Sequence, residues 1–336
     1  MTDFLPLGKL KPQVLREFLS RHAVADPRVL VGPQIGEDAA VVDIGDRYLL
    51  LTSDPITFTP DRIGWYAVQI NANDIAAMGG RPLYFLSTLL LPEEKMRAND
   101  AEAIFSDVAE ACRALGCTPV GGHTEVTSGI ERPILSGTMV GEVERDRLVT
   151  SSGARPGDML VLARGIAIEA TAILAREKAE QIKTTLGEDF HRQALRFLED
   201  PGLSVLGASR AACAGAGVHA MHDPTEGGIA NALWELAEAS EVGLVVGETE
   251  IPRYWESNEL AKLFEFDLLG AIASGALLIA TEEEKTSSVL ERLTEAEIAA
   301  NVIGRVVNKE TGVNLLRGEQ TVPLPRFEAD ELSRLL

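Results

Sequence analysis

Acidic residues stand beside Gly, Ala or Asn at several points where an expected strand meets a loop. They are Asp38, Asp54, Asp74, Glu125 and Asp223. A single Asp in such a position is usually a turn or cap residue, but five acids with small neighbours are less easily explained in that way. Hard divalent cations such as Mg²⁺ prefer carboxylate oxygens and share them with phosphates and water. If these acids converge from separate segments, they would offer such a cation its ligands.

Asp74 is the most unusual of these acids because it lies on the apolar face of an expected helix. That helix begins near residue 61, and its inward positions before Asp74 are Ile63, Ala67 and Ile70. A carboxylate on an inward face is costly to desolvate unless a cation or hydrogen-bond donors meet it. This segment alone leaves two interpretations open at even odds. One is a metal or ligand role, and the other is a core Asp satisfied by a backbone amide.

Two glycine pairs add backbone N–H groups near the acids. Gly121-Gly122 follows an expected strand, and Gly227-Gly228 opens an expected helix, whose N-terminus favours an anion. Each pair by itself is weak evidence, since most such pairs are simple turns. His123 follows the first pair and is either a hydrogen-bonded loop histidine, the favoured interpretation, or a general base.

Several common nucleotide and hydrolase motifs do not occur in the sequence. It has no GxxxxGK[ST], no GxGxxG after a strand, no HExxH and no GxSxG. A Walker-type phosphate loop, a Rossmann dinucleotide site, a zincin and an α/β-hydrolase are therefore disfavoured.

Charge and cysteine content narrow the choice of partners. The net charge is −20, from 31 basic and 51 acidic residues, which opposes binding to nucleic acid or to anionic membranes. It fits a cytoplasmic protein whose anionic ligands need Mg²⁺ as a mediator. The cysteines form no CxxC pair, so neither a disulfide framework nor a structural zinc site is expected. We also find no signal peptide and no apolar run of about 18 residues that could span a membrane.

The elements that position these groups divide into two expected domains, 1–150 and 151–336. In the first, an expected hairpin at 40–52 delivers Asp38 and Asp54 to strand ends. Residues 118–120 form a strand that feeds Gly121-Gly122. A loop-rich stretch at 151–158 follows, and beyond it strands alternate with helices, which predicts an α/β second domain. The expected strands of that domain are 159–163, 218–221, 244–246, 276–280, 301–307 and 313–316.

Six motifs that occur in order resemble the AIR synthase (PurM) superfamily over nearly the whole chain. They are GEDAA (36–40), TSDP (52–55), NDIAAMGGRP (73–82), GGHTE (121–125), GARPGD (153–158) and HDPTEGG (222–228). The resemblance is nearest to HypE-like hydrogenase maturation proteins. It implies a two-domain α/β (α+β) PurM-like fold, in which ATP and Mg²⁺ bind between a β-rich N-terminal domain and an α/β C-terminal domain. It also implies a homodimer built as a barrel from the N-terminal domains.

The resemblance also implies roles for individual residues. Asp38, Asp74 and Asp223 correspond to metal ligands, Asp54 assists at the phosphates, and His123 is the second catalytic candidate. The candidate nucleotide-binding residues are Lys9, Asn71, Asn73, Gly121, Gly122, Glu125, Gly227 and Gly228. Lys9 belongs to residues 1–12, which otherwise read as a disordered terminus. Residues 13–24 read as a short amphipathic helix.

The implied activity is ATP- and Mg²⁺-dependent transfer of phosphate to an oxygen of an unknown small substrate, or activation of that oxygen. The sequence ends in ELSRLL and its last cysteine is Cys213, so we do not expect the cyanide chemistry of true HypE, which uses a terminal cysteine. Three alternatives stay open: a HypE-type maturation factor with a protein partner, a non-catalytic nucleotide-binding module, and a ThiL-like small-molecule kinase.

Overall fold

A seven-stranded sheet forms the base of the N-terminal half in this computed structural model, which describes residues 4–336 apart from 6 and 23. Its strand order is β1-β2-β3-β7-β5-β6, with β4 paired to β7. All pairs are antiparallel except β5 with β6. The strands are β1 Val29–Val31, β2 Ala40–Asp43, β3 Arg47–Thr52, β4 Pro55–Ile56, β5 Arg81–Pro92, β6 Thr118–Thr127 and β7 Ile134–Glu144.

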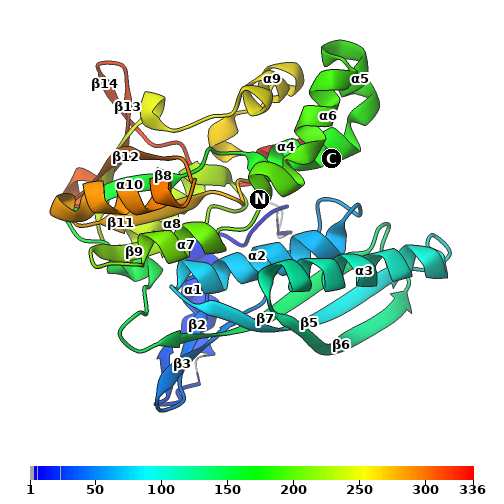
Figure 1. Cartoon of the computed structure of the whole chain (residues 1–336), viewed down its shortest axis with the longest axis horizontal. Coiled ribbons are helices and arrows are strands. Elements are labelled where there is room, and N and C mark those ends of the chain that lie inside the picture. Colours follow the sequence, from blue (N-terminus) through cyan, green and yellow to red (C-terminus); the bar gives the residue numbers. More distant parts are fainter. Residues whose placement is uncertain (1–3, 6, 23) are drawn as a thin grey trace.

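Three helices accompany this sheet. They are α1 Pro12–Arg21, α2 Ile63–Ala77 and α3 Ala98–Leu115. Figure 1 shows α2 and α3 side by side across one face of the sheet, with α2 also facing the C-terminal half. Every residue of α2 except Trp65 is buried. Burying one Ile side chain stabilises a fold by about 1.5–3 kcal/mol, so this helix anchors both halves and holds Asp74 in place.

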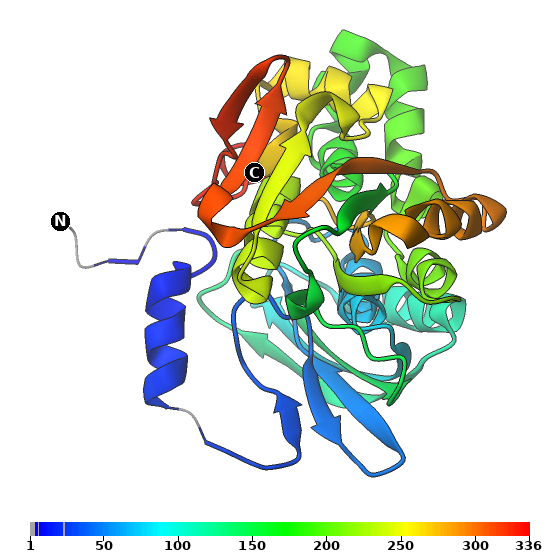
Figure 2. The same cartoon turned by 90° about the vertical axis from the view of Figure 1, so that its left-hand side faces the viewer.

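A second seven-stranded sheet forms the C-terminal half, in the order β14-β13-β10-β12-β8-β11-β9. Its strands are β8 Met159–Ala163, β9 Val218–His222, β10 Gly243–Gly247, β11 Leu277–Thr281, β12 Ala300–Val307, β13 Val313–Arg317 and β14 Gln320–Pro323. The helices are α4 Ile168–Glu177, α5 Ala179–Leu186, α6 Glu188–Arg196, α7 Leu206–Ala212, α8 Gly228–Ser240, α9 Trp255–Phe264 and α10 Thr286–Glu295. The predicted order of a β-rich half before an α/β half is confirmed (Figures 1 and 2).

The predicted hairpin is also confirmed, because β2 and β3 pair in antiparallel register from Ala40 opposite Leu51 to Asp43 opposite Tyr48. The prediction that a strand ends at residue 120, before Gly121-Gly122, is wrong. Both glycines lie inside β6, which pairs with β5 over most of its length. Gly122 has φ 145°, and a Cβ on it would lie 1.9 Å from the Ser87 carbonyl oxygen. Only glycine fits so close to the neighbouring strand, so the pair serves strand packing.

The N-terminal segment differs partly from the prediction. Helix α1 covers most of the helix predicted at 13–24 but ends at Arg21. Residue 23 of that prediction lies outside the described residues, as do residues 1–3 and 6 of the arm. None of the described α1 residues is buried. Among the described helices, none is long and apolar enough to cross a membrane.

Candidate functional site

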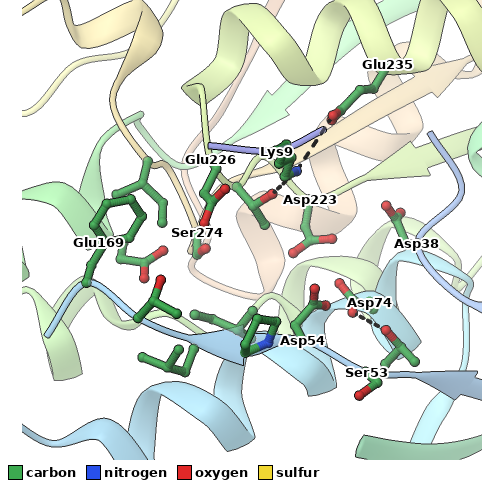
Figure 3. Close-up of a pocket in the computed structure, with 18 of the residues that line it drawn as sticks. Lys9, Asp38, Ser53, Asp54, Asp74, Glu169, Asp223, Glu226, Glu235 and Ser274 are labelled. Atoms are coloured by element: carbon green, nitrogen blue, oxygen red, sulfur yellow. Dashed lines mark hydrogen bonds and ion pairs between the residues drawn. The ribbon is translucent and has the colours of Figure 1, made fainter. Parts of the chain in front are cut away.

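A cavity of about 430 Å³ lies between the two halves and collects most of the predicted acids. The N-terminal half supplies the loop before β2, the segment after β3 and part of α2. The C-terminal half supplies the first turns of α4, the loop between β9 and α8, and the loop before β11. Figure 3 shows the carboxyl groups of Asp38, Asp54, Asp74 and Asp223 gathered around one part of this cavity.

Asp223 follows directly after β9, and its side chain is almost fully buried, with 1% exposed. Neither of its carboxylate oxygens has a hydrogen-bond partner within the described part of the chain. Burial raises the pKa of Asp223 to about 8, and the nearby charge of Asp38 acts in the same direction. A buried acid without donors is costly. The charges of His222 and Lys9 offset part of this cost without a hydrogen bond to Asp223, so the site has a place for a further positive group.

Asp38 and His222 form an ion pair beside Asp223. The two groups meet at 2.5 Å between Asp38 Oδ1 and His222 Nδ1, and His222 Nε2 lies 3.0 Å from Glu235 Oε2. Burial alone would lower the pKa of His222, but the carboxylates of Asp38 and Glu235 raise it well above its usual range. The second oxygen of Asp38 accepts a hydrogen bond from the Ser151 hydroxyl. Asp38 of the N-terminal half is therefore held by two partners that both lie beyond residue 150.

Asp74 and Asp54 are positioned by short hydrogen bonds within the N-terminal half. The Thr52 hydroxyl donates to Asp74 Oδ2 at 2.5 Å. The backbone N–H of Asp54 donates to Asn71 Oδ1 at 2.9 Å, and the Asn71 amide donates back to the Asp54 carbonyl at 3.3 Å. Burial raises the pKa of Asp74, and the neighbouring Asp54 and Asp223 carboxyls raise it further. Asn71 therefore acts on the site by fixing the backbone of Asp54.

These donors fit a hard divalent cation. One ligand atom from each of Asp38, His222 and Asp223 lies within 4.8 Å of the others. Since His222 is already paired with two carboxylates, the oxygens of Asp223 and Asp38 are the suitable donors, with Asp74 across the cavity (Figure 3). A cation here would relieve both the unpaired state of Asp223 and the repulsion among the acids.

Lys9 of the N-terminal arm is the only lysine among the described residues that line the cavity. Its ammonium donates to Thr225 Oγ1 at 3.2 Å and lies 3.7 Å from Glu235 Oε1. The charge of Glu235 raises the pKa of Lys9, although half of the Lys9 side chain is exposed and water screens part of this effect. Lys9 is therefore charged and close to the carboxyl cluster (Figure 3).

Asn73 does not border the cavity. Its amide group links the two halves: Nδ2 donates to the Leu203 carbonyl at 2.8 Å, and Oδ1 accepts from the Val205 N–H at 2.9 Å. Both ends of this buried side chain are thus used within the protein. A direct role in nucleotide binding stays a sequence prediction.

Gly121, Gly122, His123 and Glu125 lie away from the cavity, on the exposed strand β6. His123 Nε2 lies 3.1 Å from Glu125 Oε2, and both side chains are at least half exposed. Within a single chain these residues do not join the carboxyl cluster, so their predicted roles would require a second molecule.

Gly227 and Gly228 stand at the start of α8, as predicted, but their N–H groups are already used. Gly227 donates to Asp330 Oδ2 at 2.8 Å, and Gly228 donates to the Thr225 carbonyl at 3.0 Å. Gly227 borders a neighbouring cavity of about 690 Å³ that the N-terminal arm also lines. The expected phosphate position is therefore occupied in part by the protein's own carboxylate.

Several residues that border the cavity were not predicted from the sequence, among them Glu235, His222 and Glu169. Glu235 and Glu169 lie among apolar neighbours on α8 and α4, and both border the cavity. That is the same signal that singled out Asp74, an acid on an apolar helix face. His222 lies within the HDPTEGG motif, immediately before Asp223.

The two halves match two models of one family. Residues 36–143 match the AIR synthase related protein N-terminal domain, and residues 155–315 match the C-terminal domain of the same family. A hydrogenase expression/formation protein of Methanocaldococcus jannaschii is 27% identical over 331 residues, covering 95% of this chain and 94% of the relative. Selenide, water dikinase of Pasteurella multocida is 30% identical over 336 residues, covering 90% of this chain and 91% of the relative.

Solved structures show the same fold. The HypE–HypF complex contains a chain that matches with a TM-score of 0.75 at 20% identity, covering 94% of this chain and 100% of the other. HypE in complex with ATP matches with a TM-score of 0.67 at 23% identity, over 94% and 92% of the two chains. At these identities the likeness concerns the fold alone, and it confirms the predicted two-domain PurM-like architecture. The family models and the relatives together identify the chain as a member of the AIR synthase related family.

Proposed function

We propose that the protein is a Mg²⁺-dependent enzyme that uses ATP to transfer phosphate to an oxygen of a small substrate, or to activate that oxygen. The observation that carries this proposal is Asp223, a buried carboxylate without a partner among the described residues, facing Asp38 and Asp74 across one cavity. The ATP complex of the fold relative HypE supports a nucleotide as the ligand.

Asp38, Asp74 and Asp223 would hold the cation. When bound, Mg²⁺ would neutralise phosphate charge, which is the main catalytic need in phosphoryl transfer. The chain's own residues do the positioning. Thr52 fixes the Asp74 carboxylate, and Asn71 fixes the backbone of Asp54. The Lys9 ammonium lies over the same cavity, where it can bind a phosphate oxygen.

We also propose that the protein is a homodimer joined through β6. This strand lies at the end of the first sheet, and its residues from Thr118 to Val126 are all exposed. Val120 and Val126 are 52% and 66% exposed. A long edge strand with exposed apolar side chains is suited to pairing with another chain. A second copy there would cover the strand that carries His123 and Glu125.

A second candidate is a nucleotide-binding maturation module without turnover. The long match to the Methanocaldococcus jannaschii hydrogenase expression/formation protein favours it, and the HypE–HypF complex shows that a relative in fold assembles with a protein partner. The two candidates share the nucleotide site and differ in whether ADP is released.

The variant Asp74→Asn tests whether the carboxyl cluster is needed for binding and turnover of ATP with Mg²⁺. Thermal unfolding is followed with ATP plus Mg²⁺ and with ATP plus EDTA, and ADP release is then measured over hours. The parent should be stabilised only when Mg²⁺ is present, by about 2.7 kcal/mol at a ligand concentration one hundred times Kd. The variant should lose this response and any ATP turnover. Without ligand it should be at least as stable as the parent, because one repelling carboxylate is gone.

Asp46→Asn is the matched control, since Asp46 lies in the exposed turn between β2 and β3, outside the cavity lining. It should respond to Mg²⁺ and ATP like the parent. ATP hydrolysis by Asp74→Asn at the parent rate would refute the role of Asp74. A parent that binds ATP but releases no ADP with any candidate acceptor supports the maturation module, and a parent without any ATP response refutes both candidates.

A further inference from the structure

The cavity has a second end, distinct from the carboxyl cluster, that none of the roles above uses. In Figure 3, Glu169 and Ser274 lie on one side of the cavity and Asp38 lies on the other. The cavity lining also includes apolar residues of both halves, namely Phe58, Ile173 and Ile272. Ile173 lies one helical turn after Glu169 on α4, and Ile272 lies two residues before Ser274. This part of the cavity therefore combines an apolar wall with two polar groups.

Those two polar groups are both buried and unsatisfied. Glu169 is 3% exposed and Ser274 is 0% exposed. Neither Glu169 Oε2 nor Ser274 Oγ has a hydrogen-bond partner in the described residues. Burying a polar group without a partner is costly. Two such groups side by side in one cavity point to a ligand that completes their hydrogen bonds.

The local backbone holds the two groups at this place. The Ala170 N–H, next to Glu169, donates to the Ile272 carbonyl at 3.3 Å and so ties the first turn of α4 to the loop that carries Ser274. Ala167, which caps this helix, adopts a left-handed conformation with φ 62°. Such a conformation is costly for a residue other than glycine. The inward position of Glu169 is therefore built into the fold.

The charge around the cavity limits what the second end can bind. Eight acidic residues border the cavity, against a single lysine, Lys9, among the described residues that line it. A further anion would be repelled, above all beside the phosphates of a nucleotide. A molecule that carries a nitrogen with N–H groups would instead donate hydrogen bonds to the carboxyl of Glu169 and to the oxygen of Ser274.

We propose that Glu169 and Ser274 form the acceptor subsite, which selects a small uncharged or cationic molecule that presents an amine or amide nitrogen and carries a short apolar body. The nitrogen contacts Glu169 and Ser274, while the apolar body packs on Ile173, Ile272 and Phe58. This subsite rests on the proposed function, since it places the acceptor beside a nucleotide. It adds the chemical class of the acceptor, and it assigns positions that bind and orient that molecule.

A matched series of probes tests this selection. 3-Methylbutan-1-amine, 3-methylbutanamide and 3-methylbutanoate share one branched apolar body and differ in the polar end. Each is titrated at neutral pH into the full chain, with and without a non-hydrolysable ATP analogue and Mg²⁺, and binding is followed by thermal unfolding and calorimetry. The amine and the amide should bind and stabilise the protein, and the carboxylate should not.

Glu169→Gln and Ser274→Ala test the residues themselves. Glu169→Gln should weaken amine binding roughly tenfold or more, because Glu169 can give up its proton beside a bound ammonium and Gln cannot ionise, and it should leave binding of the ATP analogue unchanged. Ser274→Ala should weaken binding of both the amine and the amide. Glu177→Gln is the matched control at the other end of α4, where Glu177 accepts a hydrogen bond from Thr59. That variant should bind all probes like the parent.

The outcomes separate the subsite from the proposed function. If the ATP analogue binds but the amine and amide bind no better than the carboxylate, the subsite proposal is refuted alone. The same holds if Glu169→Gln binds the amine as tightly as the parent does. If the ATP analogue does not bind, the proposed function fails, and the titrations without nucleotide still decide whether Glu169 and Ser274 select nitrogen donors.

Discussion

At the scale of single residues, the cavity combines acids that repel one another with acids that have no partner. Asp223 and Glu169 come from different elements of the C-terminal half, yet both are buried and keep unpaired oxygens among the described residues. For Asp223 a cation is the natural complement, and for Glu169 a hydrogen-bond donor is. The two ends of the cavity therefore differ in chemistry although both are acidic.

Glu169 should make the stability of the protein depend on pH. Burial raises its pKa from the ordinary value of 4.5 to about 8. The Ser274 hydroxyl, which is close to Glu169 but does not reach hydrogen-bond geometry, opposes this rise, and Asp330, Glu226 and Asp223 reinforce it. Between these two pH values the folded chain keeps a proton that the unfolded chain has lost. The free energy of unfolding should therefore fall as pH rises through this window, by about 1 kcal/mol per pH unit from this residue.

Glu169→Gln should remove this contribution. Urea unfolding of the parent and the variant at several pH values across the window gives the difference in stability, which should be small at the acidic end and grow toward pH 8 in favour of the variant. A constant difference would show that Glu169 does not keep its proton in the folded state.

The sequence predicted one set of five acids, and the structure brings four of them, Asp38, Asp54, Asp74 and Asp223, to one cavity, while Glu125 lies on β6. It did not single out Glu235 or Glu169. Both stand on helices whose apolar faces were recognised, but whether an acid there faces a cavity depends on packing against distant segments. Glu235, for example, meets Lys9 from the other end of the chain.

At the scale of elements, α2 links the two halves through Asn73. Asn73→Ala should lower the free energy of unfolding by about 2–4 kcal/mol, because it leaves a buried N–H of Val205 and a buried carbonyl of Leu203 without partners. Urea unfolding measures this loss. The stabilisation by ATP and Mg²⁺ should persist, since Asn73 does not border the cavity.

Asn258→Ala is the matched control for Asn73. The Asn258 amide donates to the Tyr254 carbonyl four residues earlier, at the start of α9, so its loss is local and should cost less than the loss of Asn73. If Asn73→Ala abolished the nucleotide response at unchanged stability, Asn73 would be a nucleotide-binding residue, as the sequence predicts.

Element types followed from the sequence better than element ends did. The spacing of apolar residues predicted α2, and β8 was expected and found at residues 159–163. The glycines of β6 predict an end of the strand that the structure does not have, because Gly usually interrupts strands. Here pairing with β5 outweighs that local preference, and the closeness of Ser87 requires a glycine at position 122.

At the scale of the whole molecule, the exposed strand β6 predicts a dimer. A charged side chain introduced on this strand should disrupt it. Val126→Lys places a cation on a strand position that is 66% exposed in the single chain, so it should leave the fold intact and disrupt the contact. Size-exclusion chromatography with light scattering should show a dimer for the parent and a monomer for the variant. Val24→Lys, at a position that is 96% exposed, should remain dimeric. A monomeric parent would contradict the proposed contact.

The two-domain architecture could be predicted from the sequence because its motifs occur in order along nearly the whole chain. The site could be predicted only in part, since it depends on which side chains of one half face the other. The nearness of Ser274 to Glu169 arises from a hydrogen bond between the backbones at Ala170 and Ile272, and no pattern of residue types marks such a bond.

The hydrogen bonds that join α2 to the C-terminal half bear on how this chain could be recombined with its relatives. Asn73 meets only backbone atoms of Leu203 and Val205, and the Ser209 hydroxyl donates to the backbone carbonyl of Ala76. On the receiving side these hydrogen bonds use no side-chain atom, although Leu203, Val205 and Ala76 are buried and their side chains must still fit the core. Chimeras that exchange whole halves between members of this family should therefore keep this junction when they retain an Asn at position 73 and a Ser at position 209.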